Sequence, residues 1–224
     1  MNILCIETST SVCSAAIVHD GEPIKQCINK EGSNHARLLP LYIEELLKTA
    51  REQGMTIDAV ALSEGPGSYT GLRIGASTAK GLCYGLNVPL IPVPTLEVLC
   101  EGARRNTEYR VQSTDRLCPM IDARRMEVYT SLDGETKAVV VEHEDSLYAG
   151  DKDIYYFGDG AAKCAKVFTR PNWHYIPDIV PEAQYVGTIG ERLGVSGERV
   201  NLAYYEPFYL KEFVAAQSHV KGLK

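Results

Sequence analysis

Three glycines follow a short apolar segment at 59–62, at a point where a strand would turn into a helix. They are Gly65, Gly67 and Gly71. A dinucleotide-binding turn needs Gly-x-Gly-x-x-Gly, and here the third glycine comes one residue too late. No Lys-Ser or Lys-Thr follows as in a phosphate-binding P-loop, and Pro66 stands where a nucleophile elbow centred on Ser68 needs glycine. What remains is a turn whose backbone N–H groups could hold an anion.

Histidines and cysteines are the other side chains that could do chemistry, as metal ligands or nucleophiles. Two imidazoles four residues apart on a helix face one way and can clamp an ion. The five histidines contain no such pair: they are His19, His35, His143, His174 and His219. Seven cysteines form an odd set without Cys-x-x-Cys, which is typical of reduced, mostly buried thiols.

The charge balance bears on nucleic-acid binding. A net charge of -6 argues against a free-standing nucleic-acid binder, because neutralising phosphates requires a basic face. The pairs Arg104–Arg105 and Arg124–Arg125 are local exceptions, and each is typical of a solvated loop. Apolar runs are only strand-sized and no signal peptide is indicated, so we expect a cytoplasmic protein without membrane contact.

The elements that must position these residues alternate between strands and helices. Strands are expected at 2–7, 13–19, 23–28, 59–62, 117–121, 127–132, 138–142 and 154–157, and helices at 35–53, 70–86 and 182–193. Asp20-Gly21 predicts a hairpin turn, and Ser33 or Asn34 could cap the first helix. Trp173 and Tyr175 are expected in a loop. The polar stretch 104–116 predicts a boundary between an N-terminal lobe at 1–103 and a C-terminal lobe at 104–224, whose last segment could pack back on the first lobe.

The helix expected at 70–86 is unusually rich in glycine. Each interior glycine costs about 1 kcal/mol relative to alanine, so such a helix needs a packing reason. Gly71 with Gly75, and Gly81 with Gly85, are pairs four residues apart that bare one surface to a close neighbour. The neighbour could be the helix's own sheet or a partner protein, and we expect a mixture of the two.

Several motifs together resemble one family. They are Ile3-Leu-Cys-Ile-Glu-Thr-Ser9, Gly65-Pro-Gly-Ser-Tyr-Thr-Gly-Leu-Arg73, Asp122-Ala-Arg-Arg-Met-Glu-Val-Tyr129 and Glu206-Pro-Phe-Tyr-Leu-Lys211. The chain is similar in these motifs to the TsaB (YeaZ-like) family, the non-catalytic paralogues of TsaD in the synthesis of threonylcarbamoyladenosine on transfer RNA. The resemblance implies that Thr95 and Leu99 stand where TsaD-like sequences carry two metal-ligating histidines.

The resemblance also implies a fold and a possible nucleotide site. The fold is α/β, with the two lobes of the actin, Hsp70 and acetate kinase group, which is ribonuclease H-like. In the ATPases of that group, turns equivalent to Glu7-Thr8-Ser9 and Gly158-Asp159-Gly160 meet phosphates. The first turn could instead satisfy its own backbone, and the second could simply be a turn that admits left-handed residues.

The implied function is that of a scaffold without metal, catalytic residues or a required cofactor. It would bind and stabilise TsaD, together with the ATPase TsaE, for modification of adenosine 37 in transfer RNA. Nucleotide could sit at the complex interface, transfer RNA would be contacted through the complex, and the chain alone would form a homodimer. Two alternatives stay open: an independent metallopeptidase, and a small-molecule kinase or ATPase.

The expected partner interface lies on the helices at 35–53 and 70–86. The first offers a broad apolar stripe and the second offers small residues. The expected set is Leu38, Tyr42, Leu46, Arg73, Ile74, Gly75, Ser77, Thr78 and Gly81.

Overall fold

The protein is built on two five-stranded sheets, and its computed structural model describes all residues except 33, 110, 112–114, 133, 198–199 and 212–224. The first sheet has the order β3-β2-β1-β4-β5. Strands β1, β4 and β5 are mutually parallel, and β2 is antiparallel to both of its neighbours. The strands are β1 (Asn2–Glu7), β2 (Cys13–His19), β3 (Glu22–Asn29), β4 (Ala59–Gly65) and β5 (Leu90–Pro94).

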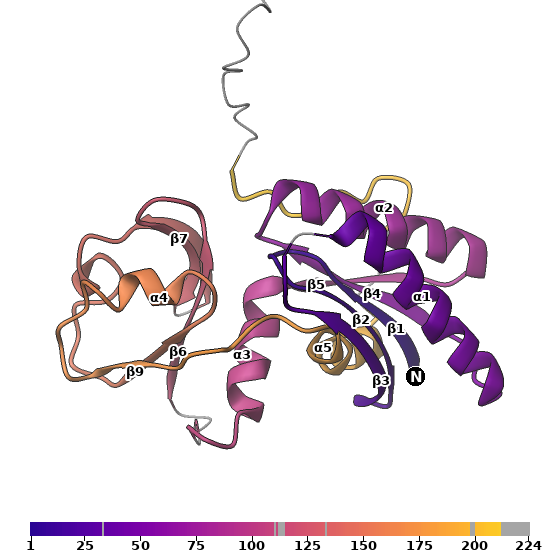
Figure 1. Ribbon diagram of the computed structural model, residues 1–224, viewed down its shortest axis with the longest axis horizontal. Helices are drawn as coiled ribbons and strands as arrows, with labels where there is room; N and C mark the ends of the chain where they lie inside the picture. Colours follow the sequence, from indigo (N-terminus) through magenta and orange to yellow (C-terminus); the bar gives the residue numbers. More distant parts are fainter. Residues whose placement is uncertain (33, 110, 112–114, 133, 198–199, 212–224) are drawn as a thin grey trace, which may run out of the picture.

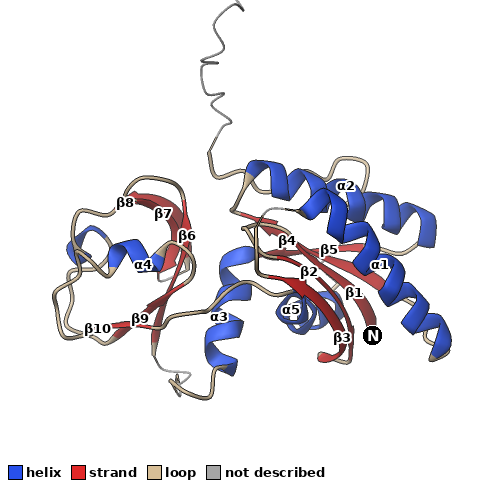
Figure 2. Cartoon of the chain, viewed as in Figure 1, coloured by secondary structure: helices blue, strands red, loops and turns tan. Residues whose placement is uncertain are grey.

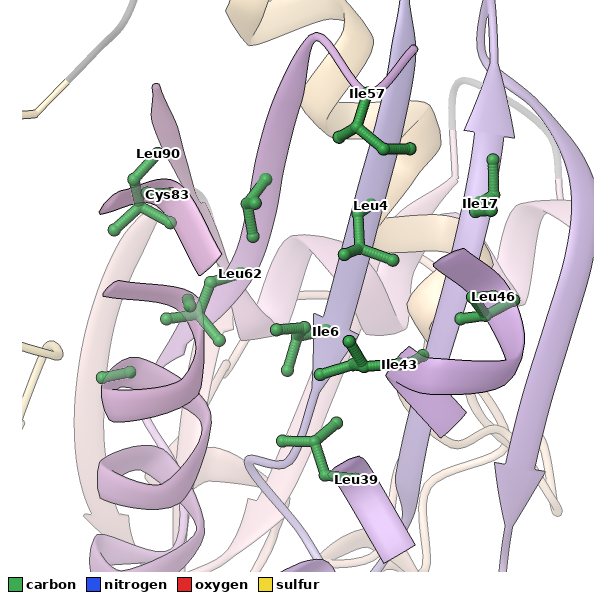
Figure 3. Packing of buried hydrophobic residues seen from close by; sticks show 14 of the residues in the cluster. Leu4, Ile6, Ile17, Leu39, Ile43, Leu46, Ile57, Leu62, Cys83 and Leu90 are labelled. Carbon is green, nitrogen blue, oxygen red and sulfur yellow. The ribbon is translucent and has the colours of Figure 1, made fainter. Parts of the chain in front are cut away.

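Helices cover both faces of this sheet, so its central strand is apolar on both sides. Along β1, Leu4 and Ile6 point to the face covered by α1 (His35–Glu52) and α2 (Tyr69–Leu86), where Leu39, Ile43 and Leu46 of α1 also pack (Figure 3). The alternate residues Ile3 and Cys5 join a second core with α5 (Ala183–Val195). The period-2 alternation of a strand explains how one segment serves two cores.

The second sheet repeats the topology of the first. Its order is β10-β9-β6-β7-β8. Counted in chain order, the first strand of each sheet (β1 or β6) is central and pairs with the second (β2 or β7) and the fourth (β4 or β9). The strands are β6 (Arg116–Asp122), β7 (Glu127–Leu132), β8 (Glu135–Val140), β9 (Ile154–Phe157) and β10 (Trp173–Tyr175). These two related sheets confirm the expected two-lobed α/β fold.

Two helices connect the halves of the molecule (Figures 1 and 2). Helix α3 (Thr95–Arg105) follows the first sheet, yet Leu96 and Leu99 pack with Ile121 and Phe157 of the second. Helix α5 comes from the second half and packs on the first sheet. The lobe boundary at 103/104 stays a prediction.

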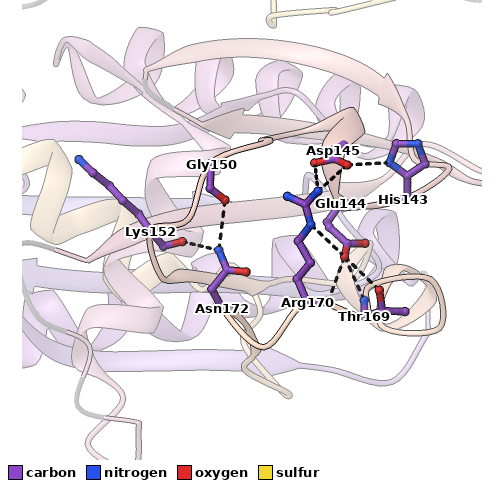
Figure 4. A network of polar contacts seen from close by, with 8 residues as sticks. All are labelled: His143, Glu144, Asp145, Gly150, Lys152, Thr169, Arg170 and Asn172. Carbon is purple, nitrogen blue, oxygen red and sulfur yellow. Dashed lines mark hydrogen bonds and ion pairs between the residues drawn. The ribbon is translucent and has the colours of Figure 1, made fainter.

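The helical elements in the middle of the second half are short. They are the 3-10 helix η1 (Glu144–Ser146), between β8 and β9, and the one-turn helix α4 (Ala161–Cys164), after β9. Polar contacts organise this region (Figure 4): the Glu144 carboxylate accepts hydrogen bonds from both backbone N–H groups of Thr169 and Arg170 and from the Thr169 hydroxyl. Burial by itself would raise the pKa of Glu144, but the hydrogen-bond donors outweigh burial and hold the pKa below its usual range. The buried carboxylate thus ties two loops together.

Some boundaries differ from those expected. Trp173 and Tyr175 form strand β10 rather than a loop, because they pair with β9. Strand β8 lies earlier than 138–142, and α3 runs into the expected linker as far as Arg105. Asn34 precedes α1 but its side chain makes no capping hydrogen bond, and Ser33 lies outside the described residues.

None of the helices in the described part of the chain is both long and apolar enough to cross a membrane.

Candidate functional site

The turn after β1 and the glycine turn after β4 are packed directly on each other. The Ser68 N–H donates to the Ser9 carbonyl oxygen at 2.6 Å, and the Thr8 hydroxyl donates to the Gly71 carbonyl oxygen at 2.9 Å. A Cβ on Gly67 would lie 2.3 Å from the Ser9 carbonyl oxygen, and one on Gly71 only 2.0 Å from that of Thr8. Glycine is therefore required at both positions by the close approach of two backbones.

The side chains of the first turn are turned inward. Glu7, Thr8 and Ser9 are all fully buried, and Glu7 Oε1 accepts from both the N–H and the hydroxyl of Ser9. Glu7 Oε2 has no hydrogen-bond partner among the described residues. Burial raises the pKa of the Glu7 carboxyl, and the hydroxyls of Ser63 and Ser9 oppose the rise. This geometry fits a turn that satisfies its own backbone better than one open to a nucleotide.

The second candidate turn, Gly158-Asp159-Gly160, follows β9 and packs against the C-terminal end of β6. Gly158 has a φ of 101°, and a Cβ there would lie 2.2 Å from the Met120 carbonyl oxygen. One carboxylate oxygen of Asp159 accepts from the N–H of Asp122 at 2.9 Å. The charge of Asp159 adds to the raised pKa of Glu7 in the first turn, and burial raises the pKa of Asp159 itself. The local bonds fit the structural role of a turn with a left-handed residue.

The two positions compared with metal-ligating histidines are part of the core. The Thr95 hydroxyl lies 2.8 Å from that of Ser63 and accepts from the Gly65 N–H at 3.0 Å. Leu99 is 1% exposed and packs against the second sheet. Among the described residues, no group of three or more His, Cys, Asp or Glu side chains could hold a metal ion. The expected absence of a metal stays a prediction.

Helices α1 and α2 together present an open surface. We define the α1–α2 face by its exposed and half-buried residues, which include seven of the nine expected ones. It comprises Leu38, Leu41, Tyr42, Arg73, Ile74, Ser77, Thr78, Gly81 and Tyr84. Periodicity had missed Leu41, which is 56% exposed beside the apolar stripe, and Tyr84, which is 86% exposed one turn beyond Gly81.

Two of the nine expected interface residues need correction. Leu46 is 0% exposed in the core between α1 and the sheet, so no partner can contact it directly. Gly75 is also buried, and a Cβ there would lie 2.4 Å from the Thr8 hydroxyl oxygen and 3.0 Å from Leu62. Both residues support the sheet rather than the surface.

A groove of about 330 Å³ lies between the first turns of the two helices. Arg37 and Ala36 of α1 line one side, and Thr70 and Ile74 of α2 line the other. His35 lies at its base, buried, with Nε2 2.8 Å from the Thr10 carbonyl oxygen. The bond to a carbonyl assigns the proton to Nε2. The groove extends the α1–α2 face toward the turn that follows β1.

The last described residues form a strap along α2. Lys80 of α2 donates to the carbonyl oxygen of Tyr205 at 3.1 Å, and the Phe208 N–H donates to that of Glu64 at 2.8 Å. The rings of Tyr209 and Tyr69 lie 5.0 Å apart. The strap therefore borders α2, and Ser77 and Gly81 stay exposed beside it.

Comparisons with known proteins found related sequences and structures. Residues 29–154 match the model of the family described as TsaD, tRNA N6-adenosine threonylcarbamoyltransferase. The tRNA threonylcarbamoyladenosine biosynthesis protein TsaB of Bacillus subtilis is 33% identical, with both chains covered completely. The TsaB of Escherichia coli is 29% identical over 96% of each chain. The solved structure of YeaZ from Pseudomonas aeruginosa has a TM-score of 0.76 and 27% identity, covering 93% of this chain and 99% of its own.

Proposed function

Since this chain belongs to the TsaB family of tRNA threonylcarbamoyladenosine biosynthesis proteins, we propose that it is the non-catalytic subunit that binds and stabilises a TsaD homologue. The α1–α2 face is the surface that binds. In the absence of that partner, the same face pairs with a second copy of this chain.

The observation that carries this proposal is the exposed stripe of small residues on α2. Ser77 and Gly81 are exposed, and a Cβ on Gly81 would meet nothing within 4 Å beyond its own helix backbone. Small residues allow a facing helix to approach closely, and Leu41 and Tyr84 add apolar area at the sides. Removing such a patch from water would supply much of the association free energy.

A scaffold role, rather than catalysis, is supported by how the candidate chemical groups are used. Thr95 and Leu99 are core residues, and the hydroxyls and carboxylate of the first turn bond to neighbouring backbone and side chains. The metallopeptidase alternative has no specific observation in its favour among the described residues. The kinase alternative has the unpartnered Glu7 Oε2 in its favour, but the Thr8 and Ser9 hydroxyls that would meet a nucleotide are buried and hydrogen-bonded within the chain. Catalysis would then belong to the partner.

Further components follow from the same proposal. A TsaE homologue would join the complex, and transfer RNA would be held mainly by the other subunits because this chain carries a net charge of -6. Any nucleotide would sit at the interface between subunits, because the Thr8 and Ser9 hydroxyls are buried and hydrogen-bonded within this chain.

The test is complex formation with the TsaD homologue of the same cell, measured by size exclusion and by titration. Gly81→Glu places a charged side chain where the isolated chain has free space, so the monomer should stay folded. We expect it to weaken the complex at least about 30-fold, which corresponds to loss of a binding hot spot of about 2 kcal/mol. Ser77→Glu should act in the same direction.

Val195→Glu is the matched control, because it adds the same charge to an exposed position at the end of α5. It should leave the affinity unchanged. If folded Gly81→Glu and Ser77→Glu proteins both bind the TsaD homologue as tightly as the parent does, the interface lies elsewhere. If the parent chain does not bind at all, the proposed function fails.

A further inference from the structure

The turn between β6 and β7 has an unusual backbone. Arg124 and Arg125 both adopt left-handed conformations, with φ of 71° and 50°. The Ala123 N–H donates to the Glu127 carbonyl oxygen at 3.1 Å, and the Glu127 N–H donates to that of Arg124 at 3.0 Å. These bonds close a three-residue loop, 124–126, between Ala123 and Glu127, and Asn or Gly adopts left-handed positions of this kind with less strain than arginine does. Two arginines here keep a strained conformation, and strain of this kind is a starting point for a hypothesis of function.

Among the described residues, the charges around the turn leave both guanidinium groups without an ion pair. Asp122 is paired with Lys163, and Glu127 is paired with Lys211 at 2.5 Å. Arg124 and Arg125 are exposed, and neither forms an ion pair or side-chain hydrogen bond within the part of the chain that the structure describes. In a chain with 29 acidic and 23 basic residues, the two carboxylates nearest in sequence to the arginines thus pair with lysines.

Positive charge is concentrated at this place. Burial and the charge of Glu127 raise the pKa of Tyr129, and the charges of Lys211 and Arg124 oppose the rise, so both cations act on the same phenol. Guanidinium groups bind phosphate with paired N–H donors, and they lose less free energy than ammonium groups when water is removed. Two adjacent, exposed arginines without an ion pair in the described part of the chain are suited to one or two phosphate groups.

We propose that the Arg124–Arg125 turn is a phosphate-binding site that contacts the backbone of transfer RNA in the assembled complex. A free nucleotide offers the same phosphate chemistry, but small molecules bind in enclosed pockets, whereas these side chains project from an exposed turn. Phosphate contacts position RNA without reading its sequence, which suits a subunit that does not hold the modified base. The inference rests on the proposed function for the identity of the RNA.

The test uses the double variant Arg124→Asn with Arg125→Gly in the complete chain, mixed with the TsaD homologue and an unmodified transfer RNA transcript that carries adenosine at position 37. Relief of strain should raise the Tm of the isolated chain by about 2–4 °C or more. Loss of two phosphate contacts should lower the slope of log affinity against log salt by roughly 1.5–2. The RNA affinity should fall at least about 10-fold near physiological salt, since each lost contact weakens binding.

A matched control is Arg104→Ala with Lys152→Ala. It removes two positive charges from exposed residues that have no ion pair within the described part of the chain. It should leave the salt slope within about 0.5 of the parent value. Competition with ATP forms a separate arm: displacement of RNA by ATP in the parent complex but not in the double variant would mean that the turn binds nucleotide, and would overturn the RNA assignment.

Complex formation is measured separately for every protein. If the double variant assembles and binds RNA with the parent's affinity and salt slope, the inference is wrong. An equal loss of RNA affinity and salt slope in the Arg104→Ala, Lys152→Ala control would mean a general charge effect and would also overturn the inference. A double variant that loses the TsaD homologue but not RNA would make the turn a protein contact. If the parent fails to assemble, the proposed function fails, and RNA titration of the chain alone at low salt tests the turn by the same slope difference.

Discussion

Helix α2 carries two glycine pairs with the same spacing and opposite surroundings. In the first pair, a Cβ on Gly71 would lie 2.0 Å from the Thr8 carbonyl oxygen, and one on Gly75 would lie 2.4 Å from the Thr8 hydroxyl. In the second pair, Gly81 and Gly85 are exposed, and an added Cβ would meet nothing within 4 Å beyond the helix backbone. The first pair is required by the fold, whereas the second is free for another use.

The difference shows that small residues on a helix can have different structural roles. The first two turns of α2 lie over the turn that ends β1, where the backbones touch. The later turns leave that contact, and there the glycines lower helix stability without any gain in packing against the described residues. A residue that costs stability and has no internal role points to a surface contact, which is the reason for placing the partner there.

The largest effect should come from Gly71→Ala. The added Cβ would overlap a backbone atom that cannot move without shifting β1, so we expect a loss of about 3 kcal/mol or more. For a chain of this size the Tm should fall by about 6–12 °C in a circular dichroism melt. A variant that melts with the parent would show that the two backbones are not in contact, and would remove the distinction between the pairs.

A moderate effect is expected for Thr8→Val, which keeps the shape of the side chain and removes the donor to the Gly71 carbonyl oxygen. Losing a buried hydrogen bond should lower the free energy of unfolding by about 1–2 kcal/mol in urea denaturation. Thr78→Val is the control, because its hydroxyl bonds to Ile74 within the same helix. Equal losses in the two variants would mean that the Thr8 bond does not tie the helix to the sheet.

A smaller effect of the opposite sign should follow from Gly81→Ala. Alanine fits the open space and favours the helix, so stability should rise by about 0.5–1 kcal/mol. The same urea titration measures it, and Gly71→Ala serves as the comparison with reversed sign. A destabilised Gly81→Ala protein would mean that the second pair also packs within the chain.

The smallest expected effect is a dependence of stability on pH, through Glu7 in the turn that packs against Gly71 and Gly75. Burial raises the pKa of Glu7 above its ordinary value of 4.5, so above that pH the folded protein holds this proton more tightly than the unfolded chain does. Stability contributed by this group is therefore complete below pH 4.5 and declines as pH rises through the raised pKa. Glu7→Gln should lack this decline, and the difference in Tm between the two proteins should shift in favour of the variant as pH rises. A difference that stays constant with pH would show that Glu7 titrates normally.

Periodicity predicted the helices and strands of the first half well, because the local pattern there agrees with the fold. Strands β1 and β2 have the expected bounds, and α2 begins one residue earlier than expected. Trp173 was misassigned to a loop because three residues give no pattern, and only pairing with β9 makes them a strand. The same holds for the Arg124–Arg125 turn, which the sequence marks only as a basic pair and whose strain is visible in the backbone alone.

The sequence by itself determined the family, the order of the elements and the glycine spacing, since these depend on residues close together in the chain. Only the tertiary structure decided which glycines are buried, because the residue that covers Gly71 and Gly75 is Thr8, 63 positions before Gly71. It also decided that Leu46 belongs to the core while Leu41 is exposed. A helical period gives the relative directions of side chains but not which direction meets the sheet, and that is set by packing between distant segments.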